Sequence, residues 1–273
     1  MKFYKRLETL LLENNPKIKI EGFKDFYAKY KKGGFFFEED FEKKAVSHPS
    51  YESFCRIVPP QDVPKRKNLT TQEGQIYLLH AIAHIEYSAI DLALDAAYRF
   101  SGKPKEYYDD WLEVADDEVR HFLMLSELLE ELGAAYGDIE VHNALFEAMQ
   151  RTAHSFLDRM AIVPRYLEAN GLDATPAILE KLEKLPKNEM LERIKKALHV
   201  IVEEEISHVQ KGDRWFSYAC EKEGREKDVY FEIVERYYPL WLGKKKELNV
   251  DARREAGFTC KELAVMAHKD VCR

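Results

Sequence analysis

The chain has 273 residues, of which 45% are hydrophobic and 33% are charged, as expected for one main globular domain with extensions. Its net charge of -7 argues against general binding of nucleic acid. No apolar run reaches the ~18 residues that span a membrane, and the N-terminus lacks the apolar core of a signal peptide. We therefore predict a cytoplasmic protein that does not insert into membranes.

The cysteines agree with this location. They are scattered along the chain without a C-x-x-C pair, which suits reduced thiols better than a disulfide scaffold or a zinc site. We expect all four to be free: Cys55, Cys220, Cys260 and Cys272.

Residues 1–70 are predicted to form an accessory segment. Leu7, Leu10 and Leu11 recur at helical spacing, which indicates a short amphipathic helix that ends before Pro16. The following part is rich in proline and charge towards its end, which favours loops. We expect this segment to wrap the main domain as loops and short helices.

Residues 71–224 are predicted to form a four-helix bundle. The first helix begins after Thr71, a residue type that caps helix N-termini, and runs to about Phe100. The second covers residues 106–132 and stops at Gly133, because glycine is common just beyond a helix C-terminus.

The third helix follows a connection over residues 134–141 and is expected to be interrupted. Pro164 removes one backbone hydrogen bond, Gly171 favours a left-handed stop, and the helical pattern restarts at Pro176. The break is expected over residues 170–176, within one or two turns of Glu168. It either accommodates packing or opens a path for a substrate, since helix irregularities often lie at functional sites.

The fourth helix is predicted to end near Gly224. Residues 225–273 then form a C-terminal helical extension rich in aromatic side chains. This extension includes a basic cluster, which we interpret as solvated charge: Lys244, Lys245, Lys246, Arg253 and Arg254.

Two Glu-x-x-His pairs are the most informative motif of the chain, Glu118 with His121 and Glu205 with His208. A spacing of three residues places both side chains of a pair on one helix face, where they can reach the same metal ion. With nine histidines in a glutamate-rich chain, about one such pair is expected by chance, so one pair alone would carry little weight.

Each pair has one glutamate in the helix that precedes it, Glu86 in the first half and Glu168 in the second. Carboxylate-bridged di-iron and di-manganese bundles use this set, one Glu from each of two helices and a Glu-x-x-His from each of the other two. In this prediction the motif glutamates bridge the ions, the upstream glutamates are terminal ligands, and each histidine binds one ion. The predicted metal ligands are Glu86, Glu118, His121, Glu168, Glu205 and His208.

The alternative is that these side chains are solvated or form ordinary polar pairs, as most glutamates and histidines on helices do. Apolar residues at helical spacing surround Glu86, Glu118 and Glu205, which argues for burial. Converging buried carboxylates repel one another unless cations neutralise them. The pattern therefore favours metal ions.

Three other polar residues are weaker candidates. His80 and His84 point away from Glu86 around their helix, so a polar interface pair is favoured over metal ligation. Arg165 either pairs with a carboxylate such as Glu204 or binds an anionic substrate, and a structural ion pair is the preferred interpretation. No phosphate-binding loop or nucleophile motif occurs, so the chemistry is expected to depend on the metals.

Six segments also carry a family resemblance: residues 79–86 (LHAIAHIE), 108–112 (YDDWL), 117–121 (DEVRH), 163–176 (VPRYLEANGLDATP), 204–208 (EEISH) and 254–258 (REAGF). In motif and order they resemble the ferritin-like family designated domain of unknown function 455, over about residues 60–258. The resemblance implies a ferritin-like core of the di-iron carboxylate type and the same six metal ligands. It implies no particular reaction.

The leading functional hypothesis is a non-haem di-iron oxidoreductase of the monooxygenase type, which activates O₂ or a peroxide to oxidise a small substrate. Two Fe ions are expected, with Mn or mixed Fe/Mn as the alternative metals, and an electron-donor protein is needed as a partner. A homodimer is left open. One alternative is an iron-binding ferroxidase without an organic substrate. A second is a tRNA-base hydroxylase, which the acidic charge does not favour.

Overall fold

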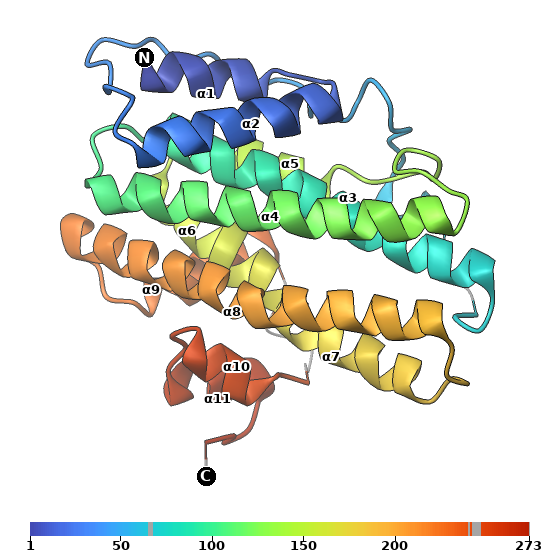
Figure 1. The fold of residues 1–273 in the computed structure, drawn as a ribbon. Coiled ribbons are helices and arrows are strands. Elements are labelled where there is room, and N and C mark those ends of the chain that lie inside the picture. Colours follow the sequence, from blue (N-terminus) through green and yellow to red (C-terminus); the bar gives the residue numbers. More distant parts are fainter. Residues whose placement is uncertain (65–67, 240, 242–246, 273) are drawn as a thin grey trace. The chain divides into compact units, whose positions relative to one another are not determined.

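The computed structural model describes residues 1–64, 68–239, 241 and 247–272, and the regular secondary structure of this part is helical, joined by loops (Figure 1). Its extended pairing is limited, in the described residues, to isolated bridges of Lys2 with Phe36 and Ile57 with Val141. The all-α prediction is confirmed. The elements are α1 (Phe3–Leu11), α2 (Pro16–Lys31), η1 (Pro60–Asp62), α3 (Gln72–Arg99), α4 (Lys105–Glu131), α5 (Ala144–Arg151), α6 (Phe156–Ile162), η2 (Val163–Glu168), α7 (Ala169–Glu183), α8 (Glu189–Glu223), α9 (Val229–Tyr237), α10 (Val250–Glu255) and α11 (Cys260–Ala267).

The chain divides into two compact units, unit 1 over residues 1–150 and unit 2 over residues 151–273. The predicted accessory segment therefore belongs to the same unit as α3 and α4. The ferritin-like bundle over residues 71–224 stays a prediction. The same holds for the predicted N-terminal segment (residues 1–70) and C-terminal extension (residues 225–273) as separate parts. None of the described helices is both long and apolar enough to cross a membrane.

The main helical hairpin of unit 1 consists of α3 and α4, which pack against each other (Figure 1). Thr71 caps α3, and its side chain accepts a hydrogen bond from the backbone N–H of Gly74 at 3.1 Å. Gly102 in the turn has φ +70°, and Gly133 beyond α4 has φ +78°, values that glycine adopts without steric cost. The predicted limits of the first two helices are confirmed.

The N-terminal segment is more helical than predicted. The amphipathic helix is confirmed as α1, with Leu7, Leu10 and Leu11 buried, and it packs against α3. The longer α2 packs against α4. Its start is encoded locally, since the Asn15 side chain accepts from the N–H of Ile18 at 3.1 Å and proline occupies the first helical position.

A buried polar cluster joins this segment to α3. Lys19 of α2 forms a buried ion pair with Asp91 of α3, and Ser50 Oγ donates to the other Asp91 oxygen at 2.6 Å. Burial lowers the pKa of Lys19, although the Asp91 charge opposes that change. Removal of either partner would leave a buried charge uncompensated. The accessory segment is therefore an integral part of unit 1.

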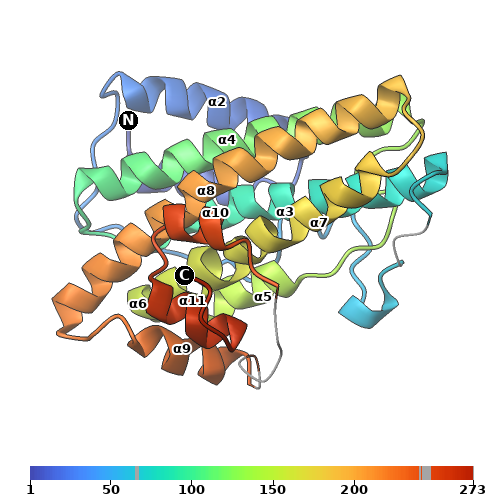
Figure 2. The same cartoon turned by 90° about the horizontal axis from the view of Figure 1, so that it is seen from below.

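In unit 2, α8 contacts α6, η2, α7 and α10, and Figure 2 shows α10 and α11 next to each other. The side chain of Asn188 caps α8 by accepting from the N–H of Leu191 at 2.8 Å. Gly224, with φ +62°, ends the helix as predicted. The predicted third helix is split instead into α5 and α6, because Ser155 accepts from the N–H of Asp158 at 3.1 Å and starts a new helix.

The irregularity in the predicted third helix lies before Glu168. Residues Val163–Glu168 form the π-helix η2. Pro164 has no N–H and its ring would clash with a regular helix, so a wider turn accommodates it. The Tyr230 hydroxyl donates to the carbonyl of Arg165 at 3.2 Å and satisfies a backbone group of this turn.

The predicted break after Glu168 is wrong. The helix α7 runs through this region with Pro176 inside it, and Gly171 does not take the left-handed conformation. Because Pro176 has no N–H, the carbonyl of Leu172 loses its regular partner. Asn249 Nδ2 donates to that carbonyl at 3.3 Å. A residue far along the chain thus replaces the missing bond, and the helix continues.

The prediction of four reduced cysteines is also wrong. Cys260 and Cys272 form a disulfide with their Cα atoms 5.8 Å apart, whereas Cys55 and Cys220 are free and buried. The pairing depends on the chain direction after α11. His268 takes the left-handed conformation, with φ +53°, so the chain turns at the end of α11.

The predicted basic cluster is not a uniform group. Lys244, Lys245 and Lys246 lie outside the described residues. Arg253 is 2% exposed, and its Nη2 lies 2.6 Å from Asp173 Oδ2, so its interpretation as solvated charge is wrong. Its position in α10, packed against α7, explains this burial. Arg254 is exposed.

Gly212 lets Pro164 of η2 pack closely against α8, because a Cβ atom at position 212 would lie 2.3 Å from the Pro164 Cβ. We expect Gly212→Ala to lower the free energy of unfolding by about 1–3 kcal/mol, as measured by urea denaturation. Gly171→Ala is the matched control, since no atom lies within 4 Å of its added Cβ. That change should stabilise the protein by about 0.4–1 kcal/mol. Equal losses in both variants would contradict this account of Gly212.

Candidate metal centre

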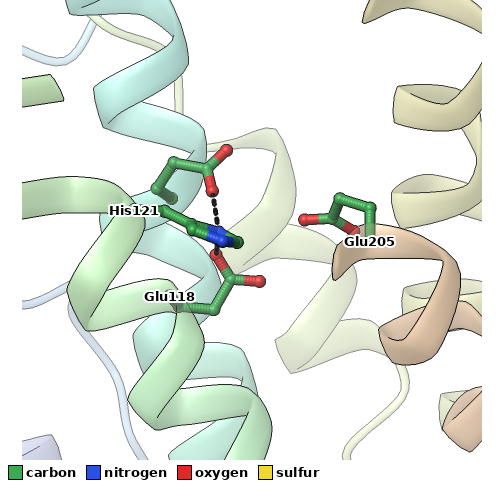
Figure 3. A group of neighbouring side chains, drawn as sticks. Glu118, His121 and Glu205 are labelled. Atoms are coloured by element: carbon green, nitrogen blue, oxygen red, sulfur yellow. Dashed lines mark hydrogen bonds and ion pairs between the residues drawn. The ribbon is translucent and has the colours of Figure 1, made fainter. Parts of the chain in front are cut away.

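Unit 1 brings three of the predicted ligands together. Glu86 lies on α3, and Glu118 and His121 lie on α4. Figure 3 labels the two α4 side chains, which lie close together. Their ligand atoms lie within 4.8 Å of one another, and all three side chains are buried. His121 Nδ1 is 3.0 Å from Glu86 Oε2 and 3.7 Å from Glu118 Oε2. The three-residue spacing and the α3–α4 turn together produce this cluster.

The charges of this cluster are coupled through His121. Burial alone would lower its pKa, but the close contacts with Glu118 and Glu86 and the negative charges of these two carboxylates outweigh burial and raise the pKa of His121 to about 11. The imidazole therefore carries a proton at neutral pH and acts as the cation between two carboxylates. A metal ion bound by the imidazole would displace that proton. The carboxylates then supply the charge that a divalent cation requires.

The second Glu-x-x-His pair lies on α8 in unit 2, where Figure 3 labels Glu205. His208 is fully buried, and its Nδ1 is 3.6 Å from Glu205 Oε1. The Glu205 Oε2 atom is buried and has no hydrogen-bond partner among the described residues. A buried carboxylate oxygen costs free energy unless a donor or a cation meets it. Glu168 is the last residue of η2, which packs against α8.

Arg165 of η2 is fully buried and anchors this element. Its Nε lies 2.8 Å from Asp213 Oδ1 on α8, and its Nη2 lies 2.9 Å from Glu262 Oε1 on α11. The predicted structural ion pair is confirmed, but with these two carboxylates in place of Glu204. The guanidinium also lies over three aromatic rings, those of Phe216, Tyr230 and Phe258. These contacts hold the backbone next to Glu168.

The structure also confirms His80 and His84 as a polar interface pair. His84 Nε2 donates to the carbonyl of His142 at 2.7 Å, and its Nδ1 lies 2.9 Å from the Tyr136 hydroxyl. His80 Nε2 accepts from the N–H of Gly137 at 2.9 Å. Because a backbone N–H can only donate, this contact requires a neutral His80.

We expect these two histidines to make the protein less stable in acid. Burial lowers the pKa of His80 and of His84 to about 4, below the ordinary histidine value of 6.5. The unfolded chain therefore binds more protons between these values, and stability falls as the pH drops from 6.5 towards 4, by about 1.4 kcal/mol per pH unit and histidine. Urea denaturation at a series of pH values measures the slope.

The matched variant is His80→Gln, whose amide oxygen can accept from Gly137 without titrating. Its slope should be shallower than that of the natural chain. His154→Gln serves as the control because the His154 side chain is 69% exposed, and it should leave the slope unchanged. Identical slopes in all three proteins would contradict the assignment.

Sequence reasoning missed the residues that support η2. Asp213 and Glu262 carry no motif that links them to Arg165, because their contacts join distant parts of the chain. One local signal was present, since Thr259 and Glu262 form a capping box at the start of α11. This box positions Glu262, whose Oε1 then meets the arginine.

The described residues form a helical protein in which a Glu-x-x-His pair occurs in each unit, with Glu118, His121 and His208 buried and Glu205 partly exposed. The chain belongs to the family described as protein of unknown function (DUF455), whose model matches residues 12–264. The match confirms membership of this family and includes most of the N-terminal segment, whereas the ferritin-like assignment stays a prediction. An uncharacterized protein of Haemophilus influenzae is 39% identical over 273 residues, which covers 96% of this chain and 92% of the relative. No solved structure matches the chain.

Proposed function

We propose that this protein is a non-haem dinuclear oxidoreductase of the ferritin-like type, which binds two iron ions or an iron and manganese pair. The observation that carries the proposal is the buried unit 1 cluster, in which two carboxylates hold His121 as a cation. The repeated Glu-x-x-His pair supports a second ion. The proposed ligands are Glu86, Glu118, His121, Glu168, Glu205 and His208.

The donor set fits these metals. Carboxylate oxygen and imidazole nitrogen suit iron and manganese, whereas thiolates would favour softer ions, and the free thiols Cys55 and Cys220 are not among the proposed ligands. The buried Glu205 Oε2 is a further acceptor that a cation would satisfy. When bound, two such ions would supply the electrons that reduce O₂ or a peroxide.

The protein's own groups have two tasks in this proposal. His121 gives up its proton when a metal binds, so metal uptake releases a proton. Arg165, fixed by Asp213 and Glu262, keeps the η2 backbone beside Glu168 in one conformation. We further propose a small organic substrate, an electron-donor protein as partner and a cytoplasmic location.

Anaerobic purification with metal analysis tests the proposal, followed by exposure to O₂ and optical spectroscopy. We expect two iron or manganese ions per chain and a spectral change on exposure to O₂. A protein that takes up no metal after anaerobic reconstitution with Fe(II) would refute the proposal. Uptake of many iron ions per chain, together with assembly into a large particle, would indicate iron storage.

A further inference from the structure

Unit 1 contains a cavity of about 280 Å³ that the proposed metal chemistry does not use. Its floor is the face of α3 that carries Tyr77, His80, Ala81 and His84. Glu86 lies about half a turn away from Tyr77 around the helix, so the cavity and the carboxylate cluster are on opposite faces of α3.

The walls of the cavity are tied together by backbone contacts. One wall consists of residues 60–64 and the other of residues 139–142. The N–H of Val58 donates to the carbonyl of Val141 at 2.8 Å, and the N–H of Val141 donates to the carbonyl of Arg56 at 3.0 Å. These two hydrogen bonds join residues 56–58, which precede the first wall, directly to Val141 of the second wall. The cavity is therefore part of the fold.

Hydrogen bonds fix the tautomers of two histidines that line the cavity. His80 Nε2 accepts from the N–H of Gly137 at 2.9 Å, so the ring proton is on Nδ1. His142 Nδ1 accepts from the N–H of Ala144 at 3.4 Å, so its ring proton is on Nε2. Neither of these ring N–H groups has a protein acceptor among the described contacts. Both are available as donors to a ligand.

The charge of the described lining residues disfavours an anionic ligand. Burial lowers the pKa of the three lining histidines, so these imidazoles are neutral at pH 7: His80, His84 and His142. Among the described lining residues the charged side chain is Glu140, which pairs with the exposed Arg56 at 3.2 Å. Among the described lining residues, a carboxylate in the cavity would lose solvation, meet no unpaired cation and face the like charge of Glu140.

The remaining walls are apolar, with Pro60 and Pro64 on one side and Ile139 and Val141 on the other. We propose that this cavity is a binding site for a neutral, planar carbonyl compound of one or two rings, whose oxygen accepts from the fixed imidazole N–H donors. The apolar walls cover the ring, and the two donors select the carbonyl oxygen. This site does not depend on the proposed metal chemistry.

Benzamide and benzoate are suitable probes because they share shape and size but differ in charge. We expect metal-free protein at pH 7.5 to bind benzamide with a Kd on the order of 1 mM by ligand-observed NMR titration. Benzoate should bind at least about tenfold more weakly, since its charge must be desolvated near Glu140. Benzamide should also shift the Nδ1–H signal of His80 in nitrogen-15 spectra.

Two variants locate the site. Ala81→Leu adds a side chain to the cavity floor and should abolish benzamide binding. Ala28→Leu, at an exposed position of α2 away from the cavity, is the matched control and should retain it. His142→Leu removes one donor and should weaken binding by about fivefold to tenfold.

Three results would overturn the proposal. They are no benzamide binding in the millimolar range, benzoate binding as tight as that of benzamide, and unchanged benzamide affinity in the Ala81→Leu variant. Circular dichroism of each variant verifies that it is folded. The Ala28→Leu protein shows whether an added leucine elsewhere on unit 1 changes the benzamide affinity.

Discussion

The double variant Glu118→Ala with Glu205→Ala is expected to reduce metal content from two ions per chain to near zero. Each change removes a carboxylate from one Glu-x-x-His pair, and in the proposed site these two glutamates serve both ions. Losing one ligand already weakens a site of this kind strongly, because the remaining groups cannot complete the coordination. Metal analysis after anaerobic reconstitution with Fe(II) measures the effect.

The same two helices offer a matched control. Glu127 on α4 and Glu203 on α8 are exposed, so Glu127→Ala with Glu203→Ala removes the same charge without touching the proposed ligands. This protein should keep its metal. If the Glu118 and Glu205 variant retains two ions per chain, the ligand assignment is wrong. If the natural chain itself binds none, the proposed function fails instead.

The second large effect is expected at Arg165. Arg165→Met keeps an apolar stem among the rings of Phe216, Tyr230 and Phe258 but removes the buried cation that Asp213 and Glu262 share, so that Asp213 keeps, among the described residues, only the partly exposed Lys227. Breaking a buried ion pair in this way costs about 3–5 kcal/mol of unfolding free energy. Urea denaturation measures the loss, and hydrogen exchange should rise first at the amides of η2 and α7.

The control for this prediction is Lys227→Met. Lys227 also pairs with Asp213, at 3.1 Å, but its side chain is 40% exposed, so its loss should cost less than about 1 kcal/mol. Arg165→Lys should lie between the two, because it keeps the charge but loses the forked geometry that reaches two carboxylates. A loss below about 1 kcal/mol in the Arg165→Met variant would show that this charge cluster does not anchor η2.

Local sequence signals predicted most helix limits well. Thr71, Gly133 and Gly224 act within one or two turns of their own positions, so their effect on the backbone can be judged without the rest of the fold. The Glu118 and His121 pair is local in the same sense. Its approach to Glu86 could also be anticipated, because one turn joins their two helices.

The errors have a common physical cause. Pro176 was expected to start a new helix, but Asn249 replaces the lost hydrogen bond of Leu172 and the helix continues. Pairing of Cys260 with Cys272 required the chain to turn beyond α11. In both cases the result depends on a group that is distant along the chain from the motif, so the local sequence pattern does not predict it.

By itself, the sequence determined the helical class, the family and the recurrence of carboxylate and imidazole groups at a spacing that places them on one helix face. Only the tertiary structure decided that His121 is held as a cation, that Arg165 pairs with Asp213 and Glu262, and that the irregular turn precedes Glu168. Periodicity and helix capping act over a few residues. Ion pairing, and hydrogen bonding of backbone groups that lack a helical partner, depend instead on which distant groups the fold brings into contact.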